Sequence, residues 1–112
     1  MDWISLNSSA QLADIIEKSK HKPQLIFKHS TRCSISSMAK NRLERVTPPE
    51  NVDFYYLDLI SYRELSTKIA EEFDVFHESP QVILIKNGEC SYDESHSGIN
   101  MDDIIEQAAL QN

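Results

Sequence analysis

A cysteine at the junction between a strand and a helix is the residue in this sequence best placed to do chemistry. Cys33 follows the short apolar run 25–27 and precedes a helical pattern. The first turn of a helix carries unpaired backbone N–H groups and the positive end of the helix dipole, and both favour an anion. Thiol pKa values are lowered at helix N-termini and fall further near cations. Arg32 is adjacent, and Lys28 and His29 are close in sequence. We therefore expect Cys33 to be a reactive thiol.

The residues that follow this cysteine predict whether a disulfide formed on it can be resolved within the same motif. Cys33-Ser-Ile-Ser36 has the outline of Cys-x-x-Cys, with serine in place of the second cysteine. The attacking sulfur is present, and the local resolving sulfur is absent. Thiol–disulfide exchange at such a site should stop at a mixed disulfide, which a second thiol must then clear.

Length and composition predict one small domain over residues 1–112. The chain is 40% hydrophobic and 26% charged, and it can bury roughly two-thirds of the surface that its unfolded form exposes. Two cysteines do not make a disulfide framework. The first residues lack the basic start and long apolar run of a signal peptide, and the aliphatic run 82–85 is far too short to span a bilayer. We expect a protein of the reducing cytoplasm.

The charge and the histidines predict which partners are absent. A formal net charge of −7 argues against nucleic acid, because binding to nucleic acid usually needs a basic patch. We expect no membrane partner either. Two cysteines and four scattered histidines lack the spacing of metal ligands, so we expect no metal site.

Alternating strand and helix patterns follow one another along the chain. We expect strands at 3–6, 25–28, 53–59, 82–85 and 89–95, and helices after the capping boxes Ser8-x-x-Gln11 and Ser61-x-x-Glu64, over 33–46, and after Asn100. Asn87-Gly88 predicts a type I′ hairpin between the last two strands. In the second helix the apolar positions fall on one face, and we expect Met38 to pack in the core; these positions are Ile35, Met38, Ala39, Leu43 and Val46.

The order β-α-β-α-β-α-β-β-α predicts an α/β fold, in which a central mixed sheet has helices on both faces. With a cysteine at the strand-to-helix turn, the whole chain resembles the thioredoxin fold. The segment 69–88, with Pro80 and the Asn-Gly hairpin, is similar to the second half of thioredoxins. The resemblance implies that Pro80 follows a cis peptide bond opposite the active cysteine. It also implies that Ser79 offers backbone hydrogen bonds to a bound thiol substrate.

Three segments of the chain indicate a particular family within the thioredoxin fold. Residues 28–36, residues 79–82 and Ser95-His96 resemble the monothiol bacilliredoxins of the YtxJ type, in which proline usually stands at the position of Ser34. The resemblance implies a thiol–disulfide oxidoreductase that removes bacillithiol from mixed disulfides on cytosolic proteins. Bacillithiol would be a co-substrate, and no cofactor would be tightly bound. The partners would be bacillithiolated proteins and a low-molecular-weight thiol.

Roles for the remaining residues follow from this layout. Thr31, Arg32, Ser34 and Ser36 are expected to tune the thiol, with Ser36 as a helix-surface hydroxyl able to bond to the sulfur. Ser79, Pro80, His96 and Ser97 are expected to contact the small thiol. Cys90 should lie too far from Cys33 to resolve its mixed disulfide. Three alternatives stay open: a binding module with an unreactive cysteine, an oxidoreductase for another small thiol, and a dithiol cycle through Cys90.

Overall fold

The computed structural model describes residues 1–110, so the last two residues of the predicted domain, 111–112, lie outside the described residues. The centre is a five-stranded mixed sheet with the strand order β1-β3-β2-β4-β5. The elements in chain order are β1 (Ile4–Ser5), α1 (Ser9–Lys18), β2 (Gln24–His29), α2 (Ser34–Glu44), β3 (Asp53–Asp58), α3 (Arg63–Glu72), β4 (Gln81–Lys86), β5 (Glu89–Ser95), the 3-10 helix η1 (His96–Gly98) and α4 (Met101–Ala109). The predicted α/β class and element order are confirmed.

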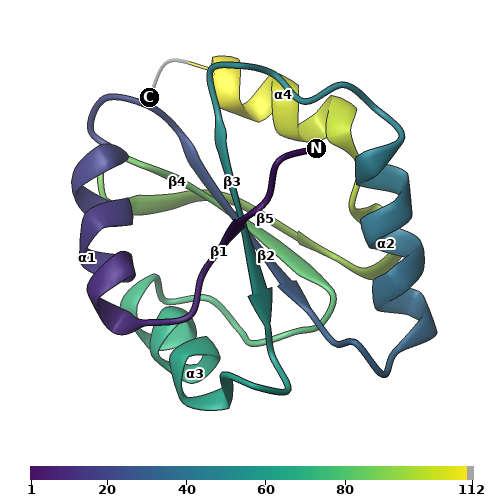
Figure 1. Ribbon diagram of the computed structural model, residues 1–112. Coiled ribbons are helices and arrows are strands. Elements are labelled where there is room, and N and C mark those ends of the chain that lie inside the picture. Colours follow the sequence, from purple (N-terminus) through teal and green to yellow (C-terminus); the bar gives the residue numbers. More distant parts are fainter. Residues whose placement is uncertain (111–112) are drawn as a thin grey trace.

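The directions of the strands bring several chain segments to one edge of the sheet. β1, β3 and β2 are parallel, whereas β4 is antiparallel to β2, and β5 is antiparallel to β4. Helices α1 and α3 cover one face, and α2 and α4 cover the other (Figure 1). The carboxyl ends of β1, β3 and β2 therefore meet at one edge, which is where sites tend to form in open α/β sheets.

Local sequence signals explain several boundaries. The Ser8 hydroxyl caps α1, and the Gln11 side chain completes the predicted capping box. The side chain of Asn100 accepts a hydrogen bond from Asp103 N–H at the start of α4. Asn87 and Gly88 both have positive φ, 53° and 77°, so the predicted hairpin turn between β4 and β5 is confirmed.

The sheet divides the core into two layers because successive strand residues point to opposite faces. In β2, Leu25 and Phe27 pack with α2 and α4, whereas Ile26 packs with α1 and α3. All three side chains are fully buried. Both faces of β2 are thus covered, and β2 ends beside the turn that leads to α2.

The buried face of α2 differs from the predicted one. Ala39 and Leu43 are buried as expected, but Met38 is 60% exposed, and Ile35 and Val46 are exposed as well. A helix that lies on a sheet buries the stripe that faces the sheet, and apolar residues outside this stripe stay in solvent. The prediction that Met38 packs in the core is therefore wrong.

The prediction of a second capping box, Ser61-x-x-Glu64, is also wrong. The Ser61 hydroxyl donates to the carboxylate of Asp58 at 3.0 Å instead of capping the helix. Tyr62 occupies the N-cap position without a side-chain hydrogen bond, and α3 begins at Arg63. The nearby carboxylate at the end of β3 competes for the hydroxyl, and the sequence pattern of a capping box does not include it.

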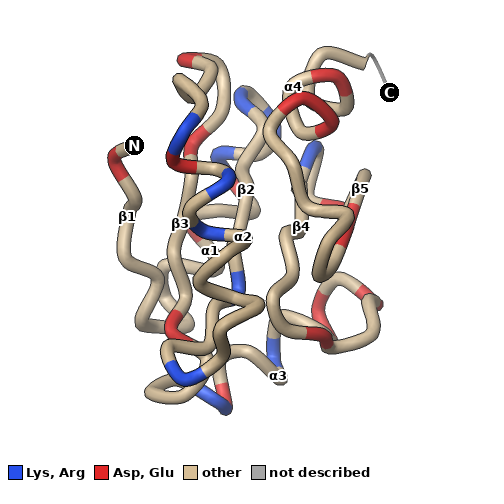
Figure 2. The backbone as a smooth tube through the Cα atoms, turned by 90° about the vertical axis from the view of Figure 1, so that its right-hand side faces the viewer, with Lys and Arg blue, Asp and Glu red and all other residues tan. Residues whose placement is uncertain are grey.

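Charged residues are unevenly placed over the surface. Figure 2 shows acidic segments on β5 and α4; these residues are Glu89, Asp93, Glu94, Asp102, Asp103 and Glu106. β5 is the edge strand opposite β1, so its acidic residues lie at the far edge of the sheet from β1. No helix among residues 1–110 is long and apolar enough to cross a membrane.

Candidate active site

Cys33 directly precedes α2 in the chain. The start of α2 lies at the edge of the sheet where β2 ends (Figure 1). Cys33 is the N-cap residue and has an extended backbone, with φ −110° and ψ 121°. Its N–H donates to the carbonyl oxygen of Ser30 at 3.1 Å, which closes the turn before the helix. The thiol is free and partly exposed. A reagent can therefore reach the sulfur.

The first turn of α2 stabilises the thiolate. The pKa of the Cys33 thiol is lowered, mainly by the backbone N–H of Ser36, while partial desolvation opposes the shift. The backbone N–H of Ile35 and the Ser36 hydroxyl lower this pKa further. All of these donors belong to the N-terminus of one helix, where N–H groups lack intrahelical partners. The predicted position of the thiol at a helix start is confirmed.

The cationic neighbours predicted for Cys33 do not contribute to this shift. Arg32 is exposed to solvent, and Lys28 points to the other face of the sheet, toward α3. His29 is only 4% exposed, and burial lowers its pKa, so the ring is uncharged at neutral pH. Closeness in sequence is a poor guide here because adjacent strand residues point to opposite faces.

Ser36 joins the turn to the reactive sulfur. It was expected on the helix surface, but it is fully buried. Its Oγ accepts a hydrogen bond from Ser30 N–H at 3.3 Å, and its hydroxyl lowers the pKa of the Cys33 thiol. The other predicted motif residues, Thr31 and Ser34, are exposed beside the thiol in the chain.

The segment before β4 approaches the same edge of the sheet. The peptide bond between Ser79 and Pro80 is cis, as the resemblance implied. Gln81 pairs with Lys28 in the antiparallel β2–β4 ladder, so Pro80 comes next to His29 at the end of β2. The Ser79 hydroxyl is buried and has no hydrogen-bond partner among the described residues.

The segment after β5 is tied both to this proline and to α2. The N–H of His96 donates to the carbonyl oxygen of Pro80 at 3.1 Å. The Arg42 guanidinium donates to the carbonyl oxygen of His96 at 3.0 Å. The side chains of His96 and Ser97 are exposed. One backbone hydrogen bond thus holds His96 beside Pro80, and the Arg42 side chain links His96 to α2.

Residues 4–104 match the family described as monothiol bacilliredoxin BrxC. The chain belongs to the monothiol bacilliredoxin family. It is 34% identical to a solved thioredoxin-fold protein to which an oxidoreductase activity has been ascribed; the match covers 93% of this chain and 91% of the other, with a TM-score of 0.81.

Two thioredoxins share the fold of this bacilliredoxin at lower identity. The Malassezia sympodialis thioredoxin Mala s 13 is 17% identical over 97% of this chain and 92% of its own, with a TM-score of 0.76. The Trypanosoma brucei brucei thioredoxin is 16% identical over 94% and 92%, with a TM-score of 0.73. The thioredoxin-like fold is thus established, and membership of the bacilliredoxin family supports a thiol redox function for the chain.

The second cysteine of this bacilliredoxin lies at the opposite end of the sheet. Cys90 pairs with Ile85, which in turn pairs with Gln24 at the start of β2, whereas Cys33 follows the end of β2. Burial raises the pKa of the Cys90 thiol, and its Sγ contacts the carbonyl oxygen of Tyr92 at 3.6 Å. The prediction that it lies out of reach of Cys33 agrees with this placement.

A polar cluster on the α3 side of the sheet was not predicted from the sequence. Lys28 Nζ lies 3.1 Å from the carbonyl oxygen of Ser66 and 3.2 Å from His77 Nδ1. The sequence held one signal for this cluster, which is that Lys28 directly follows the apolar run 25–27. A lysine that continues such a run in a central strand is buried, and it then needs polar partners. Its partners come from a helix and a loop far along the chain, so the sequence does not identify them.

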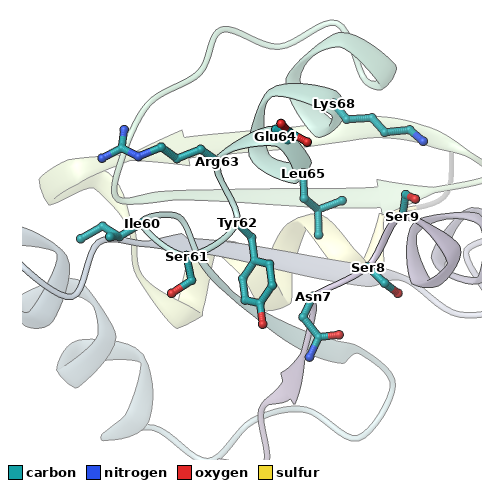
Figure 3. A pocket seen from close by; sticks show the side chains of 10 residues that line it. All are labelled: Asn7, Ser8, Ser9, Ile60, Ser61, Tyr62, Arg63, Glu64, Leu65 and Lys68. Atoms are coloured by element: carbon teal, nitrogen blue, oxygen red, sulfur yellow. The ribbon is translucent and has the colours of Figure 1, made fainter.

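A pocket of about 520 Å³ lies at the same edge of the sheet as the N-terminus of α2, where β1 and β3 end. It is lined by the N-terminal ends of α1 and α3; its lining residues are Asn7, Ser8, Ser9, Ile60, Ser61, Tyr62, Arg63, Glu64, Leu65 and Lys68 (Figure 3). Ile60 follows Leu59, whose N–H donates to the carbonyl oxygen of His29 at 2.9 Å. One end of the pocket therefore adjoins the segment that leads to Cys33, but Cys33 does not line it.

Proposed function

We propose that this bacilliredoxin removes bacillithiol from mixed disulfides of cytosolic proteins through Cys33. The observation that carries the proposal is a partly exposed thiol at the N-cap of α2, whose pKa is lowered by the first turn of that helix. A binding module with an unreactive cysteine would not need this arrangement. The family to which the chain belongs supports bacillithiol as the small thiol.

The reaction follows from having one reactive sulfur. The Cys33 thiolate attacks the bacillithiol sulfur of the mixed disulfide, and a bond forms between these two sulfurs. The disulfide bond between the bacillithiol sulfur and the substrate's cysteine sulfur breaks, the substrate thiolate leaves with both electrons of that bond, and it takes a proton from water. A second bacillithiol thiolate then attacks the bacillithiol sulfur of the adduct, which frees Cys33 and yields bacillithiol disulfide.

The lowered pKa of Cys33 helps most in this second step. A low-pKa thiol is a good leaving group, and a carrier with one cysteine must be expelled from its adduct by another thiol. Ser36 cannot replace that thiol, because its oxygen only donates and accepts hydrogen bonds. Bacillithiol therefore serves as a co-substrate, and the cycle needs no bound cofactor.

The residues that gather near Cys33 would hold the incoming disulfide. Ser79 would offer its backbone to the substrate beside Pro80, and the exposed side chains of His96 and Ser97 would contact the small thiol. The bond between His96 N–H and the carbonyl oxygen of Pro80 supports this, since it keeps these two segments side by side.

Mass spectrometry after incubation with a bacillithiolated protein tests the proposal. The reduced protein should gain one bacillithiol on Cys33, Cys33→Ala should gain none, and Cys90→Ala should behave as the wild type. Transfer that is unaffected by Cys33→Ala would contradict the proposal. A glutathionylated copy of the same substrate gives the comparison of small thiols, and faster transfer from that copy would favour another thiol as co-substrate.

A further inference from the structure

Lys28 is a buried lysine in the central strand β2, with an accessible surface of 0%. None of the ion pairs among residues 1–110 includes it. Burial lowers its pKa to about 8, so the side chain is still mostly charged at neutral pH. A buried ammonium without a carboxylate partner is unfavourable for folding. Its presence therefore points to a role other than stability.

The partners of this ammonium lie on α3 and on the loop 74–79. Nζ is 3.1 Å from the carbonyl oxygen of Ser66 and 3.2 Å from Nδ1 of His77. The Ser66 hydroxyl is 3.3 Å from the same Nδ1. Burial and the charge of Lys28 lower the pKa of His77, while Glu78 in its own loop opposes this shift. A neutral imidazole can accept a hydrogen bond from the ammonium at Nδ1.

Gln81 holds the same loop from the neighbouring strand. It pairs directly with Lys28 across β2 and β4, and it is 3% exposed. Its Nε2 donates to the carbonyl oxygen of Phe76 at 2.9 Å, and its Oε1 accepts from Glu78 N–H at 3.4 Å. Lys28 and Gln81, two buried polar side chains at paired strand positions, therefore both bond to residues of the loop 74–79. The loop ends at Ser79, next to the cis bond.

We propose that Lys28 is a positioning residue, which binds His77 and so holds the loop 74–79 in the place from which Ser79 and Pro80 meet an incoming disulfide. The proposal rests on the proposed function, because it assigns these two residues to substrate binding. Lys28 does not touch the reacting sulfurs. Its loss should slow reactions with a protein substrate and leave the intrinsic reactivity of Cys33 unchanged.

Four variants test this role. Lys28→Met removes the ammonium and keeps the length of the side chain, and His77→Leu removes the acceptor from an exposed residue, so it should fold. His77→Asn keeps an acceptor near the position of Nδ1. Lys86→Met is the matched control, since Lys86 lies at the far end of β4 and bonds to the carbonyl oxygen of Gln107. Each is measured for hydrogen exchange in the loop 74–79, for transfer of bacillithiol from a bacillithiolated protein, and for alkylation of Cys33 by iodoacetamide.

Lys28→Met and His77→Leu should each raise amide exchange in the loop and lower the second-order rate constant of transfer, both by about tenfold, the size expected for one charged hydrogen bond. Alkylation should change less than about twofold, because the first turn of α2 is untouched. His77→Asn should recover most of the transfer rate, and Lys86→Met should match the wild type in all three measurements.

Unchanged loop exchange in both Lys28→Met and His77→Leu would overturn the proposal. Faster exchange with an unchanged transfer rate would overturn it as well, since the loop would then not position the substrate. Equal losses in His77→Asn and His77→Leu would contradict the role of the acceptor. A wild-type protein that transfers no bacillithiol would refute the proposed function, and the exchange data would still decide whether Lys28 holds the loop.

Discussion

The backbone N–H of Ser30 donates to the hydroxyl oxygen of Ser36 at 3.3 Å. This bond ties the start of the turn that follows β2 to the first turn of α2, with Cys33 between the two. The same hydroxyl also lowers the pKa of the Cys33 thiol. In this bacilliredoxin Ser36, which stands in place of a second cysteine, therefore stabilises the turn before α2 and lowers the pKa of the Cys33 thiol.

Ser36→Ala should raise the pKa of Cys33 and lower the stability of the protein. The variant removes a donor to the thiolate and leaves the Ser30 N–H without its acceptor, which should reduce the free energy of unfolding by about 1–2 kcal/mol. The rate of alkylation of Cys33 as a function of pH and urea unfolding measure the two effects. Ser37→Ala, at an exposed neighbouring position, is the control and should leave both unchanged. An unchanged pKa in Ser36→Ala would show that the backbone alone sets it.

Met38→Lys should fold as well as the wild type. Met38 is 60% exposed, and substitutions at exposed sites usually change stability by no more than about 0.5 kcal/mol. Leu43→Ala, on the buried face of the same helix, should lower the free energy of unfolding by about 2–5 kcal/mol. Urea unfolding of both variants tests which face of α2 is buried. A large loss in Met38→Lys would restore the predicted core position.

Lys28→Met should make the protein more stable at neutral pH. Its folded-state pKa of about 8 lies below the ordinary 10.5, so the folded state resists binding a proton that the unfolded state holds. The cost of this buried charge is present below about pH 8 and disappears as the pH rises from about 8 to 10.5. After the loss of two hydrogen bonds, a gain of about 1–3 kcal/mol should remain.

Urea unfolding at neutral pH and again near the upper end of that pH window checks this prediction. The stability gain of Lys28→Met over the wild type should shrink at the higher pH, because near pH 10.5 the wild-type lysine is neutral in the folded state and about half neutral in the unfolded state, so little of the cost of the buried charge remains. Lys86→Met should show no such gain. A variant that is less stable than the wild type at neutral pH would mean that the two hydrogen bonds outweigh the cost of burying the charge.

The place of Cys33 could be predicted because it depends on local signals. A short apolar run followed by a helical pattern puts position 33 at a helix start, and donors of the first turn are present at any such start. The hairpin at Asn87-Gly88 and the cap at Asn100 follow from equally local chemistry. The three-segment site could be predicted only through the resemblance to thioredoxins, since it joins residues more than forty positions apart.

The features that could not be predicted depend on contacts across the fold. Apolar residues such as Ile35 and Met38 match a helical stripe, but which stripe is buried is decided by how α2 lies on the sheet. The source of the lowered thiol pKa was predicted in part. The helix N-terminus was foreseen, but the role given to Lys28 and His29 was wrong, because one points to the opposite face and the other is buried and uncharged.

The pH dependence of the alkylation of Cys33 tests the central claim most directly. In the Cys90→Ala protein, the rate with iodoacetamide should rise to a plateau with a midpoint below the ordinary thiol pKa of about 8.5. The adduct should map to residue 33 and should form readily at neutral pH. A midpoint at or above the ordinary value, or a sulfur that resists the reagent at neutral pH, would contradict a thiolate held at the start of α2.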